Sequence, residues 1–140
     1  GYCVHGFSNE NSSFRDTLYS AGQGAVFLML SGEESCHSSG YGFIEDIFLG
    51  NRSYTEINAP EDSLIIISPS SLHACSEEQF KALSCDFGSR MITRKHNHYP
   101  TCTGEDVAFA AKQADSGKVS LIKLGENGEW GRIILTGATC

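Results

Sequence analysis

The sequence lacks the short motifs that mark many enzymes and metal sites. It has no Cys-x-x-Cys pair, whereas zinc sites and thioredoxin-type redox sites usually carry their cysteines in such pairs. It has no Gly-x-Ser-x-Gly motif, so a nucleophile elbow of the serine-hydrolase type has no support. It also lacks an apolar run of the roughly 18 residues that a membrane-spanning helix needs. The sequence therefore predicts no membrane insertion.

Basic residues and prolines are scarce as well. Lysine and arginine number 10 against 17 acidic residues, and the net charge is −7. An acidic chain is poorly suited to non-specific binding of nucleic acid or of anionic membranes. Only three prolines accompany 15 glycines, a composition typical of many turns and short strands.

Cysteine is the residue type that stands out by its presence. Six cysteines are dispersed over 140 residues, an even number that favours three disulfides in an oxidising compartment. We therefore expect a single domain, residues 1–140, that is secreted or lies at the cell surface. Fifteen pairings are open to six cysteines. The expected disulfide residues are Cys3, Cys36, Cys75, Cys85, Cys102 and Cys140.

Strand-like segments dominate the pattern of apolar residues. The clearest is 63–68 (SLIIIS), because consecutive isoleucines favour a sheet over a helix. Segments 119–124 and 130–135 flank Asn127-Gly128, which predicts a hairpin with a type I′ turn. Further strands are expected at 25–30, 41–49, 53–57 and 80–87. A helix starting at Ser76-Glu77-Glu78 is the competing prediction for the last of these.

Two short helices are predicted beside these strands. One covers 14–21 behind a serine cap, and the other covers 107–114 behind a capping box at Thr103-Gly104-Glu105-Asp106. Strands follow one another without βαβ alternation, so the expected fold class is β-rich α+β. We expect an antiparallel sandwich, a jelly roll or a curled sheet with one or two short helices, stabilised by disulfides.

One short segment, 89–99 (SRMITRKHNHY), concentrates positive charge. Guanidinium groups bind phosphate or carboxylate, histidines act as acid or base, and an aromatic ring stacks on a base or sugar. A solvated polar loop explains the same residues without any function. The binding residues we predict are Arg90, Arg94, Lys95, His96, His98 and Tyr99.

Histidine spacing raises the question of a metal. His96 and His98 would share one face of a strand, with His73 as a third ligand if the fold brings it close. No fourth ligand is placed by a motif. We therefore predict no metal site and no cofactor.

Two family resemblances add alternatives. The segment 64–73 (LIIISPSSLH) and the run 25–33 (AVFLMLSGE) are similar to strands of cupin-like β-barrels. That resemblance implies a ligand-sensing barrel, but the His-x-His metal motif of the family is missing upstream. Near-terminal cysteines, an early helix and a closing hairpin resemble secreted ribonucleases of the T1 type and the non-catalytic effectors built on that scaffold. The catalytic order of that family is not found here.

These observations favour a secreted recognition module without catalytic activity, such as an effector with a role in virulence, a toxin-like binding subunit or an adhesin tip. Its expected partner is a protein or glycan receptor, and nucleic acid is not favoured. The alternative is a small secreted hydrolase, ribonuclease-like or glycan-acting, with His96, His98 and Arg94 as its catalytic residues and Arg90 or Arg132 as further cations. Trp130 is expected to lie in the core.

Overall fold

A computed structural model describes most of the second half of the chain and parts of the first half. The described residues are 19–21, 30, 42–50, 57–68, 76–92, 96–98, 102–125 and 127–137, without the side chains of 19–21, 96–98 and 102. The expected strands at 25–30 and 53–57 lie largely outside these residues. So do residues 14–18 of the expected first helix.

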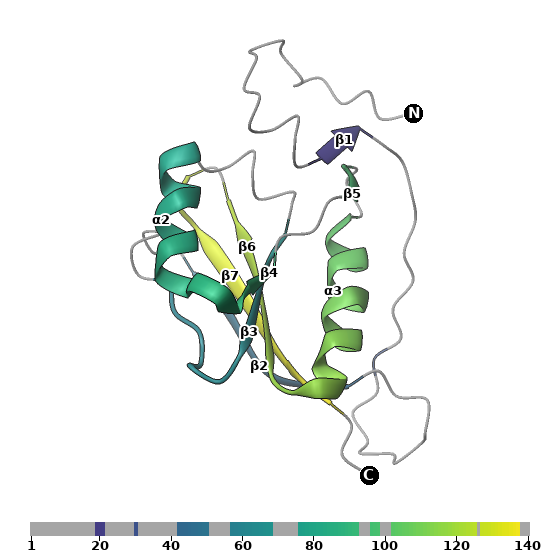
Figure 1. The fold of residues 1–140 in the computed structure, drawn as a ribbon. Coiled ribbons are helices and arrows are strands. Elements are labelled where there is room, and N and C mark those ends of the chain that lie inside the picture. The colour runs from purple at the N-terminus through teal and green to yellow at the C-terminus, as the bar shows by residue number, and fades with distance from the viewer. Residues whose placement is uncertain are drawn as a thin grey trace.

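The described chain is built on one mixed sheet of five strands (Figure 1). The strand order across the sheet is β2-β7-β6-β3-β4. β3 pairs in parallel with both β6 and β4, whereas β7 runs antiparallel to β6 and β2. The strands are β2 (Phe43–Gly50), β3 (Leu64–Ile67), β4 (Met91–Ile92), β6 (Val119–Leu124) and β7 (Trp130–Thr136).

Two helices cover opposite faces of this sheet (Figure 1). α2 (Glu77–Phe87) connects β3 to β4, and α3 (Cys102–Gln113) lies between β4 and β6. A short 3₁₀ turn follows each helix, η3 (Gly88–Arg90) and η4 (Ala114–Ser116). A separate parallel pair is formed by β1 (Tyr19–Ala21) and β5 (His96–His98).

Alternation along the strands divides the core between the two faces. Odd residues of β3 and even residues of β6 face α2, and the opposite residues face α3. The α2 face buries Ile65, Ile67, Phe80, Leu83, Phe87, Ile122, Leu124 and Trp130. The α3 face buries Ile66, Ala110, Ala111, Ala114, Val119, Leu121 and Leu135. Because β3 and β6 are covered on both sides, their side chains are apolar in nearly every position.

The strand predicted at 80–87 is wrong, and the competing helix is confirmed. Ser76 caps α2 by accepting a hydrogen bond from the backbone of Gln79, whose side chain accepts in turn from the Ser76 backbone N–H. This reciprocal capping box starts the helix. The helix buries Phe80, Leu83 and Phe87, which recur at the spacing of a helical face.

The C-terminal hairpin is confirmed, but its turn differs from the expected one. β6 and β7 pair from Val119↔Leu135 to Leu124↔Trp130. The loop is closed by a hydrogen bond of 2.8 Å from the Gly125 N–H to the Glu129 carbonyl. Gly128 has a φ of 86°, and no described residue other than glycine has a positive φ. A type I′ turn needs two such residues, so the connection is a longer loop, and among its described residues only Gly128 adopts the left-handed conformation.

The β-rich α+β class is confirmed, with one sheet and two short helices. The expected sandwich, jelly roll or curled sheet was predicted to be antiparallel, whereas the described sheet is mixed, with β3 parallel to β4 and β6. The antiparallel expectation is wrong because α2 connects the parallel strands β3 and β4 in a βαβ unit, at residues where a strand was predicted. Residues 19–21 form a strand, where the sequence predicted helix. None of the helices described is long and apolar enough to cross a membrane.

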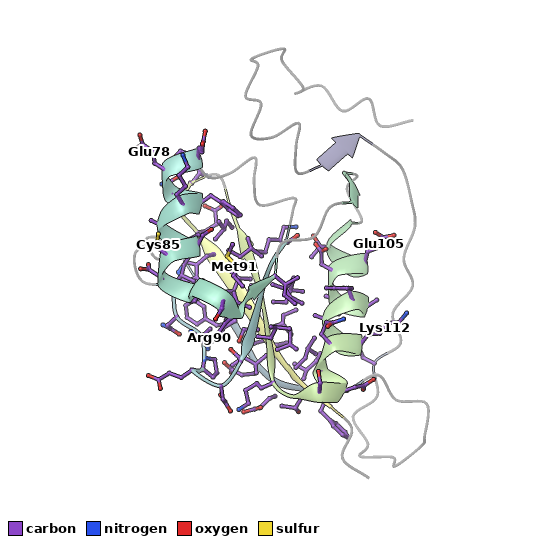
Figure 2. The ribbon with its side chains drawn as sticks, viewed as in Figure 1. Glu78, Cys85, Arg90, Met91, Glu105 and Lys112 are labelled. Carbon is purple, nitrogen blue, oxygen red and sulfur yellow. The ribbon has the colours of Figure 1, made fainter. Side chains whose placement is uncertain are left out.

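Cys85 departs from the expected disulfide framework. It lies exposed on α2 as a free thiol (Figure 2). The side chains of the other five cysteines lie outside those described, and their pairing stays a prediction.

Edge strand β2 is joined to the sheet by two ion pairs as well as by its ladder with β7. Glu45 accepts from Lys118 Nζ at 2.9 Å, and this hydrogen bond raises the pKa of Lys118 above its usual value. Asp46 accepts from Arg132 Nη2 at 2.9 Å. Both carboxylates of β2 are thereby neutralised by cations of the same molecule, one just before β6 and one on β7.

Candidate functional site

The carboxyl ends of the parallel strands form the region where we looked for a site. Both α2 and α3 begin at this end of the sheet, and β5 lies beyond the start of α3 (Figure 1). The order of the strands changes direction between β3 and β6, since the chain leaves β3 toward β4 on one side and returns to β6 on the other. Ligands of open α/β sheets bind at such a switch point, outside the carboxyl ends of the strands. We call this region the carboxyl edge, defined by Ser68, Thr103, Asp106 and Lys123.

A buried hydrogen bond joins β3 to α3 at the carboxyl edge. Ser68 and Asp106 are both fully buried, and Ser68 Oγ donates to Asp106 Oδ2. The Ser68 N–H donates to the Ile122 carbonyl at 2.9 Å, which extends the pairing of β3 with β6 by one residue. Asp106 lies in the second turn of α3, which begins at Cys102. The first turns of α3 are therefore fixed to the end of β3.

A second contact lies on the solvent side of the same region. Lys123 Nζ, on β6, donates to Thr103 Oγ1 at 2.7 Å. Thr103 was expected to cap the helix from outside, but α3 begins one residue earlier, at Cys102. The side chain of Lys123 is exposed, so the carboxyl edge carries one accessible positive charge from the sheet itself.

Two parts of the predicted basic segment after Arg90 are described, β4 and β5. His96, Asn97 and His98 form β5, pairing with Tyr19, Ser20 and Ala21. β5 ends four residues before α3 begins. Arg94, Lys95 and Tyr99 lie outside the described residues, and so does His73. His96 and His98 lie on a strand, the arrangement that the metal hypothesis assumed, and their binding role stays a prediction.

Arg90 has a structural position instead. Its Nη1 donates to three backbone carbonyls, those of Pro60, Glu61 and Ser63, at 2.7, 2.9 and 3.2 Å. Its guanidinium carbon also lies 5.9 Å from the centre of the Phe87 ring. Figure 2 places Arg90 at the end of α2. Because these groups engage the guanidinium within the fold, we exclude Arg90 from the proposed contact residues.

Arg132 is likewise engaged within the fold. Its Nη1 donates to the Asn58 carbonyl at 2.8 Å, and its Nη2 pairs with Asp46. It lies on β7, on the α2 face of the sheet, opposite Phe48. The hydrolase alternative counted Arg132 as a cation for charge stabilisation, and this arrangement gives it a structural role.

The prediction that Trp130 lies in the core is confirmed, since only 3% of its surface is exposed. The ring packs at 4.7 Å, centroid to centroid, on Phe48. Within the described part of the chain, no group of three or more histidine, cysteine, aspartate or glutamate residues is arranged to hold a metal ion.

Sequence reasoning missed the buried Ser68–Asp106 pair. Asp106 was noticed only as part of a capping box, and Ser68 only as the end of a strand. A signal was present, because a polar residue at the end of a fully apolar strand often marks the carboxyl edge of a parallel sheet. It could be read only once β3 was known to be parallel to its neighbours.

Comparison of the chain with protein-family models, with curated proteins and with solved structures found no match. The functional argument therefore depends on the site itself.

Proposed function

We propose that the chain is an extracellular recognition module that binds an acidic glycan at the carboxyl edge, without catalysing a reaction. The contact residues are Arg94, Lys95, His96, His98 and Tyr99, which we call the contact segment. Lys123 adds a cation from the sheet.

The observation that carries this proposal is where the contact segment begins and ends. In the sequence it starts two residues after β4 and finishes three residues before α3, and β4 ends and α3 begins at the carboxyl edge. This is the part of an open α/β sheet at which ligands bind. The two arginines with fixed internal partners, Arg90 and Arg132, lie outside the contact segment, which leaves its own cations as the ones proposed to meet a ligand.

The chemistry of the contact segment suits an acidic sugar. Arginine binds carboxylate or sulfate through two parallel hydrogen bonds, and lysine adds a point charge. An aromatic ring such as that of Tyr99 offers the apolar surface on which a sugar packs. Since the chain carries a net charge of −7, long acidic polymers are repelled overall. Binding would therefore require the local cation cluster rather than the net charge.

The extracellular location remains part of the proposal and depends on the remaining cysteines. With Cys85 free, the other five form at most two disulfides and leave one more thiol unpaired. Thiol titration of denatured but unreduced protein is therefore expected to give two free thiols per chain. Six free thiols would contradict the extracellular assignment, and none would contradict the free state of Cys85.

Binding is best measured with a sulfated oligosaccharide and its desulfated counterpart, using the full chain at low and at physiological salt. We expect the sulfated probe alone to bind, with an affinity that falls as salt rises because charges are screened. The variant Arg94→Ala/Lys95→Ala is expected to lose at least about tenfold in affinity, or roughly 1.4 kcal/mol.

The matched control is Lys112→Ala, which removes an exposed lysine near the opposite end of α3 from Glu105 (Figure 2). It is expected to bind like the unaltered protein, whereas Lys95→Ala alone is expected to bind more weakly. Equal losses in these two variants would show a non-specific charge effect and contradict the proposed site. Preferential binding of an acidic peptide or of RNA, or cleavage of any probe, would contradict the glycan-binding function.

A further inference from the structure

The edge strand β2 carries exposed apolar side chains that do not belong to either core cluster. Ile44, Ile47 and Leu49 of β2 are 40%, 56% and 81% exposed. They lie opposite Leu135, Ile133 and Gly131 of β7, on the α3 face. We call these three residues the β2 strip.

The β2 strip is exposed because α3 packs over the middle of the sheet. The α3-face core formed by Ala110, Ala111 and Ala114 includes side chains from β3, β6 and β7 but none from β2. Gly131 adds to the exposure, since it offers no side chain beneath Leu49, and a Cβ placed there would lie 2.9 Å from Leu49 Cδ2. The apolar stripe of the sheet thus continues past the helix that covers it.

Residues 46–50 of the edge, which follow the β-bulge of β2, lack several features that usually prevent strand pairing between molecules. Proteins protect sheet edges with lysine, proline or unpaired charges, but β2 reads FIEDIFLG and contains neither lysine nor proline. Its two carboxylates, Glu45 and Asp46, are ion-paired with Lys118 and Arg132. A second copy approaching this edge would therefore meet little like-charge repulsion.

We propose that two copies of this chain associate through antiparallel pairing of β2 with β2, joining their sheets edge to edge. The β-bulge of β2 lies between Ile44 and Asp46, so residues 46–50 form a regular stretch. A two-fold axis at Phe48 puts Ile47 of one copy opposite Leu49 of the other and Phe48 opposite itself. Such an axis, normal to the sheet, keeps each residue on its own face, and the two β2 strips become one apolar surface.

The proposed pairing also limits association to two copies. The opposite edge strand, β4, has only two residues, which makes it a poor template for another chain. Since the described strands leave one long edge per sheet, the contact between copies is isologous, and association ends at a dimer rather than continuing as a fibre. An interface of this kind is small, so a dissociation constant on the order of 10–100 µM is expected.

The test is sedimentation equilibrium of the full chain between about 1 and 500 µM, with the free thiols of the folded protein blocked by iodoacetamide so that the exposed Cys85 cannot cross-link two copies. We expect the mass to rise from 15.2 kDa toward twice that value. Leu49→Lys is expected to weaken association at least about tenfold, because each substitution puts two lysines into a two-fold interface.

Leu30→Lys is the matched control, since Leu30 is a described leucine of similar exposure, 77%, outside β2. It is expected to dimerise normally. Circular dichroism checks that each variant folds, and Ile47→Lys provides a second variant on β2. Slower hydrogen exchange of the backbone amides of residues 46–50 at high protein concentration would locate the contact. A monomer at every concentration, or a dimer that Leu49→Lys leaves unchanged, would overturn the proposal.

Discussion

Trp130→Ala is expected to cost about 3–5 kcal/mol of unfolding free energy, the largest effect of any single substitution considered for this chain. The indole is the only tryptophan and is almost completely buried. It belongs to the α2-face core and packs on Phe48. A domain of this size has a total stability of roughly 5–15 kcal/mol. The variant is therefore expected to be partly or wholly unfolded at 37 °C, as measured by urea denaturation followed by far-ultraviolet circular dichroism.

Trp130→Phe is the control for this experiment. The indole Nε1 is buried without a hydrogen-bond partner among the residues described, so the unaltered protein gains nothing from that group. Phenylalanine keeps most of the apolar surface and removes the unpaired donor, and a cost of only about 1 kcal/mol is expected. If alanine were tolerated as well as phenylalanine, the packing of β7 against α2 would be contradicted.

Asp106→Ala is expected to cost about 3 kcal/mol, the second largest effect. The substitution removes a fully buried carboxylate and leaves the Ser68 hydroxyl without this acceptor. The loss of a buried hydrogen bond costs about 1–3 kcal/mol, and the cavity adds to that. Asp115→Ala is the control, because Asp115 is an exposed aspartate in η4 and its removal should change stability by less than about 0.5 kcal/mol.

A double-mutant cycle isolates the Ser68–Asp106 contribution. Ser68→Ala alone is expected to cost about 1–2 kcal/mol, and the double variant is expected to cost less than the sum of the two, since each single variant already loses the hydrogen bond between them. Strictly additive costs would show that the two side chains are not coupled, and the joint between β3 and α3 would have to depend on other contacts.

Local patterns predicted the elements whose environment is simple. The isoleucines of β3 and the run on both sides of Asn127-Gly128 lie in buried strands, and the alanines of α3 form one helical face. A strand was predicted at 80–87 because every second residue there, from Lys81 to Phe87, falls on one face of a strand. The residues that the helix buries, Phe80, Leu83 and Phe87, have helical spacing instead. Recognising the Ser76–Gln79 capping box would have decided between the two patterns.

The parts of the site that the sequence did not predict depend on contacts between distant segments. Arg90 binds carbonyls 27 to 30 residues away, and Arg132 binds Asn58 across 74 residues. A positive charge in a sequence gives no sign of whether such carbonyls will surround it. The grouping of Arg90 with Arg94 and Lys95 therefore followed their proximity in the chain rather than in space.

The central position of β3 has a consequence for the order in which this protein is assembled. Its parallel partner β6 comes much later in the chain, and the hydrogen bond from Ser120 to Ser63 beside this pairing spans 57 residues. Closing so long a loop costs entropy before any contact repays it, which slows folding. During synthesis, β3 and α2 leave the ribosome well before β6 and β7. At usual synthesis rates of about 5–20 residues per second, the apolar side chains of β3 and α2 therefore stay exposed for seconds before β6 and β7 can pack against them. A chaperone that binds isoleucine-rich segments of nascent chains would bind β3 during that interval.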